Sequence, residues 1–183
     1  DYILGFNFYR YLSENELRFF KEQGMPDDDI RQMDESDEDF VNYTKDTIGY
    51  FIAYENLFST WLDKGNNFDV SDVRRALSAF NRLISDSHKK VFEKIFNTLQ
   101  TGLSKLGETS TTQTKSINEL IKLIRRIPMD GKQDYDVLGF IYEYLISQFA
   151  ANAGKKAGEF YTEWSKSLYT VFLNLYLLVE RIL

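Results

Sequence analysis

Apolar side chains recur at helical spacing between residues 70 and 84, and this pattern constrains the fold more than any other in the chain. They lie three and four positions apart, at Val70, Val73, Leu77, Phe80 and Ile84. That period places them in one stripe along an α-helix. Either Asp69 or Ser71, which flank Val70 at the start of the stripe, can cap the helix N-terminus. The pattern predicts a helix whose apolar stripe is buried against other elements.

Similar periodicity predicts helices along most of the chain. The expected segments are 1–23, 40–46, 55–64, 88–101, 117–127 and 134–152. Ser116 can cap the helix at 117–127, after a polar connector at 108–114. The run Gly49-Tyr50-Phe51-Ile52 instead favours a short strand. We therefore expect a mainly α fold, a helical bundle with at most a short β-hairpin.

Composition favours one globular domain without disulfides or structural zinc. A chain of 183 residues, 43% of them hydrophobic, can bury a core of its own. The chain has no cysteine and a single histidine, His88, which excludes a disulfide framework and the ligand clusters of zinc centres. No glycine-rich nucleotide loop or nucleophile elbow is present. These features predict a cytoplasmic protein without a self-sufficient active site.

Charge is segregated along the chain. Residues 1–63 hold 15 acidic and 5 basic side chains, and residues 64–183 hold 13 acidic and 17 basic ones. Much of the acidity lies in residues 27–39, for which we expect a solvated, flexible loop rather than a cation site. The basic residues of the second part are Arg74, Arg75, Arg82, Lys89, Lys90, Lys94, Lys122, Arg125, Arg126, Lys155 and Lys156. If they share a face, that face suits a nucleic-acid backbone; the alternative is solvated helix surface.

A loop that follows the helix at 134–152 has the composition of a ligand-binding segment. Residues 154–162 read Gly-Lys-Lys-Ala-Gly-Glu-Phe-Tyr-Thr. Glycine lets a backbone approach a ligand closely, aromatic faces hold cationic or planar groups, and a hydroxyl can bond a carboxylate. The alternative is a helix C-cap at Gly154 followed by an ordinary surface loop.

An ordered series of short segments resembles a known family. The segments are Tyr2-Ile3-Leu4-Gly5-Phe6, Tyr11-Leu12-Ser13, Gly49-Tyr50-Phe51-Ile52, Leu57-Phe58-Ser59, Phe92-Glu93-Lys94-Ile95-Phe96, Ser104-Lys105-Leu106-Gly107, residues 135–146 and the loop at 154–162. Their order resembles the N-terminal helical region of the modification (methyltransferase) subunit of type I restriction-modification systems. The resemblance covers residues 1–162.

The resemblance implies a cofactor and candidate residues for binding it. The intact subunit of that family transfers a methyl group from S-adenosylmethionine to the N6 nitrogen of adenine. For this reaction the target base must leave the stacked bases of the DNA duplex. The family's Gly-Glu-Phe-Tyr-Thr element contributes to the methionine end of the cofactor site. Carried over by position, the candidates are Gly158, Phe160, Tyr161 and Thr162. Thr162 would donate to the cofactor carboxylate, and the aromatic residues would flank its cationic part.

The chain also departs from the family's pattern. Glu163 follows Thr162 where the family usually has proline, and residues 163–183 form a strongly apolar segment. We expect this segment to be a C-terminal helix that faces core or partner, because its uninterrupted apolar run is shorter than the roughly 18 residues of a membrane span. We further expect that the catalytic domain is absent, and that this chain alone is inactive and does not bind S-adenosylmethionine.

The resemblance also predicts binding partners for this chain. The resemblance implies that the helical domain at 1–162 engages double-stranded DNA, senses its methylation state, and assembles with the specificity and restriction subunits, with no membrane partner. An alternative is a helical protein-interaction module that self-associates through the apolar tail at 163–183 and does not act on DNA.

Overall fold

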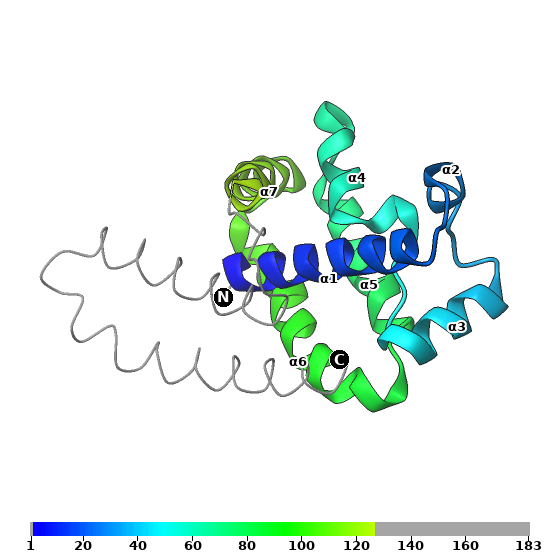
Figure 1. The fold of residues 1–183 in the computed structure, drawn as a ribbon. Coiled ribbons are helices and arrows are strands. Elements are labelled where there is room, and N and C mark those ends of the chain that lie inside the picture. The colour runs from blue at the N-terminus through cyan, green and yellow to red at the C-terminus, as the bar shows by residue number, and fades with distance from the viewer. Residues whose placement is uncertain (1, 127–183) are drawn as a thin grey trace, which may run out of the picture. The chain divides into compact units, whose positions relative to one another are not determined.

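Helix α1 (Tyr2–Glu22) runs through the middle of the domain, and the other helices surround it (Figure 1). The computed structural model describes residues 2–126, except for the side chains of 2–4, 87, 90, 91, 93–95 and 98. The predicted helix at 134–152, the loop at 154–162 and the tail at 163–183 lie outside the described residues. Residues 1–126 form one compact unit.

The other helices follow in chain order. They are α2 (Asp27–Ile30), α3 (Glu38–Ile48), the 3-10 turn η1 (Tyr54–Asn56), α4 (Phe58–Asp63), η2 (Gly65–Asn67), α5 (Val70–Arg82), α6 (Asp86–Gly102), η3 (Leu103–Leu106) and α7 (Ser110–Arg125). Helix α1 contacts α4, α6 and α7, and α5 contacts α6 and α7. The prediction of a mainly α fold is therefore confirmed for the part of the chain that the structure describes.

The helix predicted from the stripe at 70–84 is α5. Asp69 caps it by accepting the backbone N–H of Ser71 at 2.6 Å, and Asp72 accepts the N–H of Asp69 at 3.1 Å. This reciprocal pair is a capping box, which satisfies donors that the first helical turn leaves unpaired. Val73, Leu77 and Phe80 are no more than 1% exposed. Of the two predicted caps the structure has Asp69, and the buried stripe is confirmed except for Ile84, which lies beyond the end of α5 at Arg82.

Aromatic rings fill the core between α1, α4, α5 and α6. Tyr9 stacks on Trp61 with ring centroids 4.9 Å apart, and Phe80 meets Phe96 edge-on at 4.8 Å. Phe8 stacks on Phe96 at 5.8 Å. Such pairs add about 0.5–1.5 kcal/mol each beyond the area that they bury. The core therefore depends on ring-to-ring packing across four helices.

The predicted strand at 49–52 is limited to a single bridge. Tyr50 pairs with Ile84 in an isolated antiparallel bridge, flanked by hydrogen bonds from Phe51 N–H to Leu83 O (3.0 Å) and from Ser85 N–H to Gly49 O (2.9 Å). No strand forms within residues 2–126. The bridge ties the segment after α3 to the end of α5. This extended segment is buried, as its apolar composition requires.

Helix α7 begins seven residues earlier than predicted. Thr109 caps it by accepting the N–H of Thr112 at 3.2 Å, while the hydroxyl of Thr112 accepts the N–H of Thr109 at 3.0 Å. Ser116 is not a cap, because it lies inside α7 and donates to Leu106 O at 2.9 Å. The threonine-rich stretch that we expected to be a connector is helical because its hydroxyls satisfy the backbone of the first turn.

Two other segments differ from the sequence-based expectation. The helix predicted at 55–64 is divided at Leu57 into η1 and α4. The acidic run at 27–39 is not a solvated loop throughout, since Asp27–Ile30 form α2. Ile30 and Met33 are 3% and 6% exposed, and Met33 O accepts the N–H of Tyr54 at 2.9 Å. These two apolar residues fix the run to the domain.

Phe80→Ala is expected to lower the free energy of unfolding by about 3–5 kcal/mol, because it leaves a cavity at the centre of the ring cluster. Urea unfolding followed by circular dichroism measures the change. Ser78→Ala lies on the exposed face of the same helix and should change stability by no more than about 0.5 kcal/mol. Similar losses in the two variants would contradict the assigned core.

Candidate functional site

The residues predicted to bind a cofactor, Gly158, Phe160, Tyr161 and Thr162, lie outside the described residues. Lys155 and Lys156 do so as well. Within residues 2–126, no cluster of three or more His, Asp or Glu side chains is placed to hold a metal ion. None of the helices in that range is long and apolar enough to cross a membrane. The described part therefore offers three features to examine: a buried polar seam, a depression on α1 and the basic surface.

The buried polar seam joins α1 to the segment at 50–58. It consists of Tyr9, Ser13 and Glu16, which lie on one face of α1. The hydroxyl of Tyr9 donates to Asn56 O at 2.9 Å. Ser13 Oγ accepts the N–H of Phe58 at 3.2 Å, and the Glu16 carboxyl accepts the N–H of Ile52 at 3.0 and 3.2 Å. Three backbone groups of the segment at 50–58 therefore form hydrogen bonds with side chains of α1.

Tyr50 also joins the seam, with its side chain bonded to α1. Its hydroxyl donates to Leu12 O at 3.0 Å and accepts from Asn15 Nδ2 at 3.0 Å. Burial raises the pKa of Tyr50, and the nearby Glu16 raises it further. The hydroxyl therefore stays protonated, as its bond to Leu12 O requires.

Glu16 is the one acidic group of the seam, and it is 0% exposed. Burial raises the pKa of its carboxyl group well above the ordinary value, while the hydrogen bond from Ile52 N–H lowers it in part. A buried carboxylate without a cation is costly, so the environment favours the protonated form. No substrate can reach a fully buried group. Glu16 therefore holds the fold together and is not a candidate catalytic residue.

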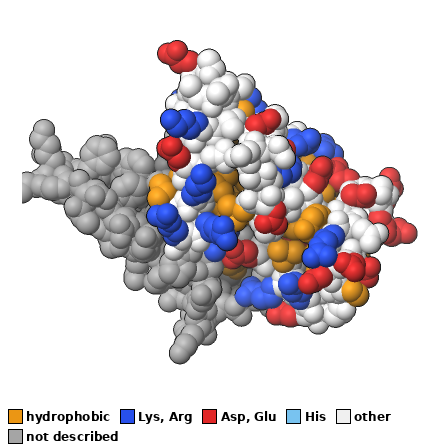
Figure 2. Space-filling model, turned by 90° about the horizontal axis from the view of Figure 1, so that it is seen from above, with side chains coloured by type: hydrophobic (Ala, Val, Ile, Leu, Met, Phe, Trp, Pro, Cys, Tyr) orange, Lys and Arg blue, Asp and Glu red, His pale blue; other side chains and the backbone are white. Residues whose placement is uncertain are grey.

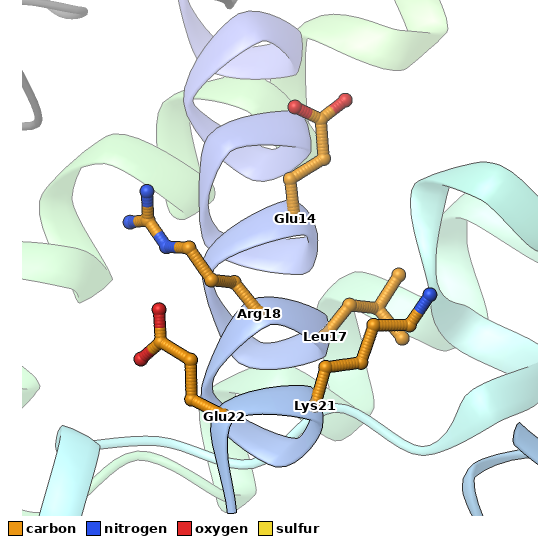
Figure 3. A pocket seen from close by; sticks show the side chains of 5 residues that line it. All are labelled: Glu14, Leu17, Arg18, Lys21 and Glu22. Carbon is orange, nitrogen blue, oxygen red and sulfur yellow. The ribbon is translucent and has the colours of Figure 1, made fainter. Parts of the chain in front are cut away.

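The depression on α1 is lined by residues of that helix alone, Glu14, Leu17, Arg18, Lys21 and Glu22 (Figure 3). Charges of both signs project from successive turns, and Leu17 is the apolar residue among them. Ligand sites are concave and mostly apolar, with a few convergent polar groups. This depression is open and shallow, and no second element among the described residues contributes a converging polar group, so we assign no ligand to it.

The basic residues of α5 are engaged with neighbouring polar groups. Asp72 pairs with Lys64 at 2.8 Å and with Arg75. Burial alone would raise the pKa of Asp72, but the hydrogen bond and charge of Lys64, with Arg75, hold it below its usual range. Arg82 pairs with Glu35 at 2.8 Å, and Arg74 donates to Gln113 Oε1 at 2.6 Å. The side chains of Lys90 and Lys94 are outside the description, and Lys89 is exposed on α6; the other unpaired members of the predicted basic set within residues 2–126 lie at α7.

On α7, Lys115, Lys122, Arg125 and Arg126 are exposed. None of them forms an ion pair with another residue in the described range 2–126. Lys122, Arg125 and Arg126 belong to the predicted basic set, whereas Lys115 was missed. It was missed because the helix was predicted to begin at residue 117.

Comparison with known families identifies the region. Residues 1–124 match the family described as the HsdM N-terminal domain. The chain belongs to that family. Residues 133–175 match the N-6 DNA methylase family, and this range includes the loop at 154–162. That match continues 13 residues beyond Thr162, where we had expected the resemblance to stop.

Two proteins related to this HsdM N-terminal domain extend the comparison. The type I restriction enzyme MpnII methylase subunit of Mycoplasma pneumoniae is 30% identical over an alignment of 179 positions, and the match covers 88% of this chain and 33% of that protein. The crystal structure of the type I restriction-modification system methyltransferase subunit from Streptococcus thermophilus superimposes with a TM-score of 0.61 at 28% identity, covering 84% of this chain and 34% of that one. The chain spans about a third of the length of both relatives.

The polar seam is the feature that sequence reasoning missed. Its signal is present, since Tyr9, Ser13 and Glu16 are polar positions spaced by four and three residues in a helix that is otherwise mostly apolar. A polar stripe on a buried helix requires partners, but the sequence does not say which backbone groups supply them.

Glu16→Gln tests the protonation state of the seam. Because the folded pKa of Glu16 is raised, its favourable contribution is complete below the unfolded pKa and is lost as pH rises through the folded pKa. Glutamine keeps an acceptor for Ile52 N–H and cannot ionise. Urea unfolding of both proteins should therefore show the variant gaining in stability relative to the parent between pH 4.5 and pH 8, by about 1 kcal/mol or more. A difference that does not change with pH would contradict a neutral buried acid.

Proposed function

We propose that this chain supplies the N-terminal part of a type I restriction-modification DNA methyltransferase subunit that methylates adenine at N6 with S-adenosylmethionine. The observation that carries the proposal is the order of the two family matches. The HsdM N-terminal domain at 1–124 is followed directly by the N-6 DNA methylase match at 133–175. The same order is expected of a subunit whose helical domain precedes its catalytic domain. The domain boundary at residue 162 remains our prediction.

The cofactor contacts that we propose rest on the loop inside the second match. Gly158 would allow close approach of the backbone, and Thr162 would donate to the carboxylate of S-adenosylmethionine. Phe160 and Tyr161 would flank its cationic sulfonium end. Glu163 is the next residue and would repel the carboxylate if it were turned toward it. The binding site needs further residues from a complete methylase domain, so we expect no cofactor binding by this chain alone.

For the helical domain we propose a role in engaging duplex DNA in the cytoplasm, in sensing its methylation state, and in assembly with a specificity and a restriction subunit. The support is the family membership together with exposed cations on α7. The domain is acidic elsewhere, and the chain carries a net charge of -6. Its own affinity for DNA should therefore be low and strongly dependent on salt.

Thr162→Val is expected to weaken S-adenosylmethionine binding about 10-fold or more in a subunit that joins this sequence to a complete methylase domain, because a hydrogen bond to a charged carboxylate is lost. Isothermal titration calorimetry measures the change. Thr170→Val, in the same family match, serves as the control and should bind normally. Equal affinities for the parent and Thr162→Val would remove Thr162 from the cofactor site.

The 183-residue chain is expected to bind a short DNA duplex at about 50 mM salt and to lose most of that binding at about 200 mM, because phosphate contacts release counterions. Fluorescence anisotropy measures binding, and sedimentation gives the size of the chain in solution. A tight dimer that is indifferent to DNA would instead support a self-associating interaction module.

A further inference from the structure

The strongest unpaired charge on the described surface is the α7 basic stripe, which we define as Lys115, Lys122, Arg125 and Arg126. Many other basic side chains of the domain are matched by an acid. Pairs join Arg10 to Glu14, Lys21 to Asp27, Arg31 to Asp28, Lys64 and Arg75 to Asp72, and Arg82 to Glu35. The stripe has no such partner within residues 2–126, although Glu119 lies between Lys115 and Lys122 on the same side of the helix. Within that range, no acidic side chain neutralises these cations in an ion pair.

The domain is electrically polarised around the stripe. The acidic run at 27–39 extends from α2 through the connection at 31–37 to the start of α3, and both helices lie at the opposite side of the domain from α7 (Figure 1). Seen from above, acidic side chains gather at the end away from α7, and a group of lysine and arginine side chains lies at the other end, while further basic side chains lie among the acidic ones (Figure 2). A separated charge distribution of this kind orients a protein toward a polyanion with its basic end first.

The stripe lies on a helix that is fixed in place along its length. Gln113 Nε2 donates to Gly107 O at 2.8 Å, and Ile117, Ile121 and Ile124 are buried. At the other end, Arg10 of α1 donates to Ile124 O at 2.7 Å. That bond satisfies a terminal carbonyl and adds positive charge where the helix dipole is negative. The cations therefore project from a rigid element.

The spacing of the stripe suits a repeating anion. Residues 115, 122 and 126 are separated by seven and four positions, so they lie on one side of α7. At 1.5 Å per residue, the stripe extends over about 16 Å of helix. A DNA duplex carries one charge per roughly 1.7 Å of its axis, so several phosphates lie within that length.

The same face is poor in the residues that characterise protein interfaces. Centres of protein–protein interfaces are enriched in aromatic residues and depleted of lysine. The exposed face of α7 instead carries Thr111, Thr112, the basic stripe and one acidic residue, Glu119, and its one large exposed hydrophobic residue is Leu123, which is 59% exposed. Hydroxyl and cationic side chains are the usual donors to phosphate oxygens. The composition favours a nucleic-acid backbone over an acidic protein.

We propose that the α7 basic stripe is the surface through which this domain contacts the phosphate backbone of duplex DNA, without reading bases. This inference rests on the proposed function and goes beyond it by assigning the contact to one helix. It places the DNA on the side of α7 that faces away from α1 and away from the acidic run.

The test compares two triple variants of the 183-residue chain with the same change in net charge. Lys122→Gln, Arg125→Gln and Arg126→Gln together remove the end of the stripe. The control, Lys45→Gln, Lys89→Gln and Lys105→Gln, removes three cations that are also unpaired within residues 2–126 but lie on α3, α6 and η3. Circular dichroism confirms that both variants fold, and anisotropy with a duplex is measured over a range of salt concentrations.

The stripe variant is expected to bind the duplex at least about 10-fold more weakly at low salt. The slope of log affinity against log salt concentration should become shallower by about three phosphate contacts. The control should keep the salt dependence of the parent. Equal losses in the two variants would mean that only net charge matters, and would overturn the assignment to α7. Unchanged binding by the stripe variant would overturn it too and would leave the proposed function intact. Failure of the parent to bind any duplex would contradict the proposed DNA role itself.

A protein partner is distinguished by a third measurement. Leu123→Ala removes the exposed apolar side chain of α7 and keeps all four cations. It is expected to leave duplex binding unchanged. If the stripe variant and Leu123→Ala both lost binding to a type I specificity subunit while duplex binding stayed normal, the surface would be a protein interface and the inference would be wrong.

Discussion

Tyr9 of α1 makes the contact on which the rest of the domain depends. Its ring stacks on Trp61 of α4 and meets Phe80 of α5 and Phe96 of α6 edge-on, at 4.9, 6.0 and 5.8 Å. Its hydroxyl donates to Asn56 O in η1. One side chain thus joins α1 to four other elements. Burial, followed by the charge of Glu16, raises the pKa of Tyr9, so the hydroxyl remains a donor.

Packing around Tyr9 separates the roles of the inner and outer faces of the domain. Inside, the polar seam satisfies the backbone of the segment at 50–58, which has no regular partner of its own. Unpaired backbone groups would otherwise be costly there. Outside, α7 is held against α1 by buried isoleucines and by Arg10, and its cations remain exposed. A rigid interior therefore presents a fixed charged surface, which the proposed contact with DNA requires.

Much of the fold was predictable because it depends on local patterns. The stripe of α5 and its cap at Asp69 follow from spacing and from the chemistry of one helical turn. The start of α7 was not predicted, because β-branched threonines are weak helix formers and only their hydroxyl bonds at Thr109 and Thr112 stabilise the turn. The order in the acidic run was missed because it depends on burial of Ile30 and Met33 by distant residues.

The sequence by itself determined that residues 2–126 are mainly helical, that the chain has no cysteine and a single histidine, and, through a resemblance, which family it belongs to. It also supplied the candidate cofactor residues from Gly158 to Thr162, which remain predictions. Only the tertiary structure decided which charges are neutralised. Arg82 of α5 meets Glu35, 47 positions away in the chain, whereas Lys122 and Arg126 meet no carboxylate within residues 2–126. Pairing depends on distances across the fold, and spacing along one helix does not contain that information.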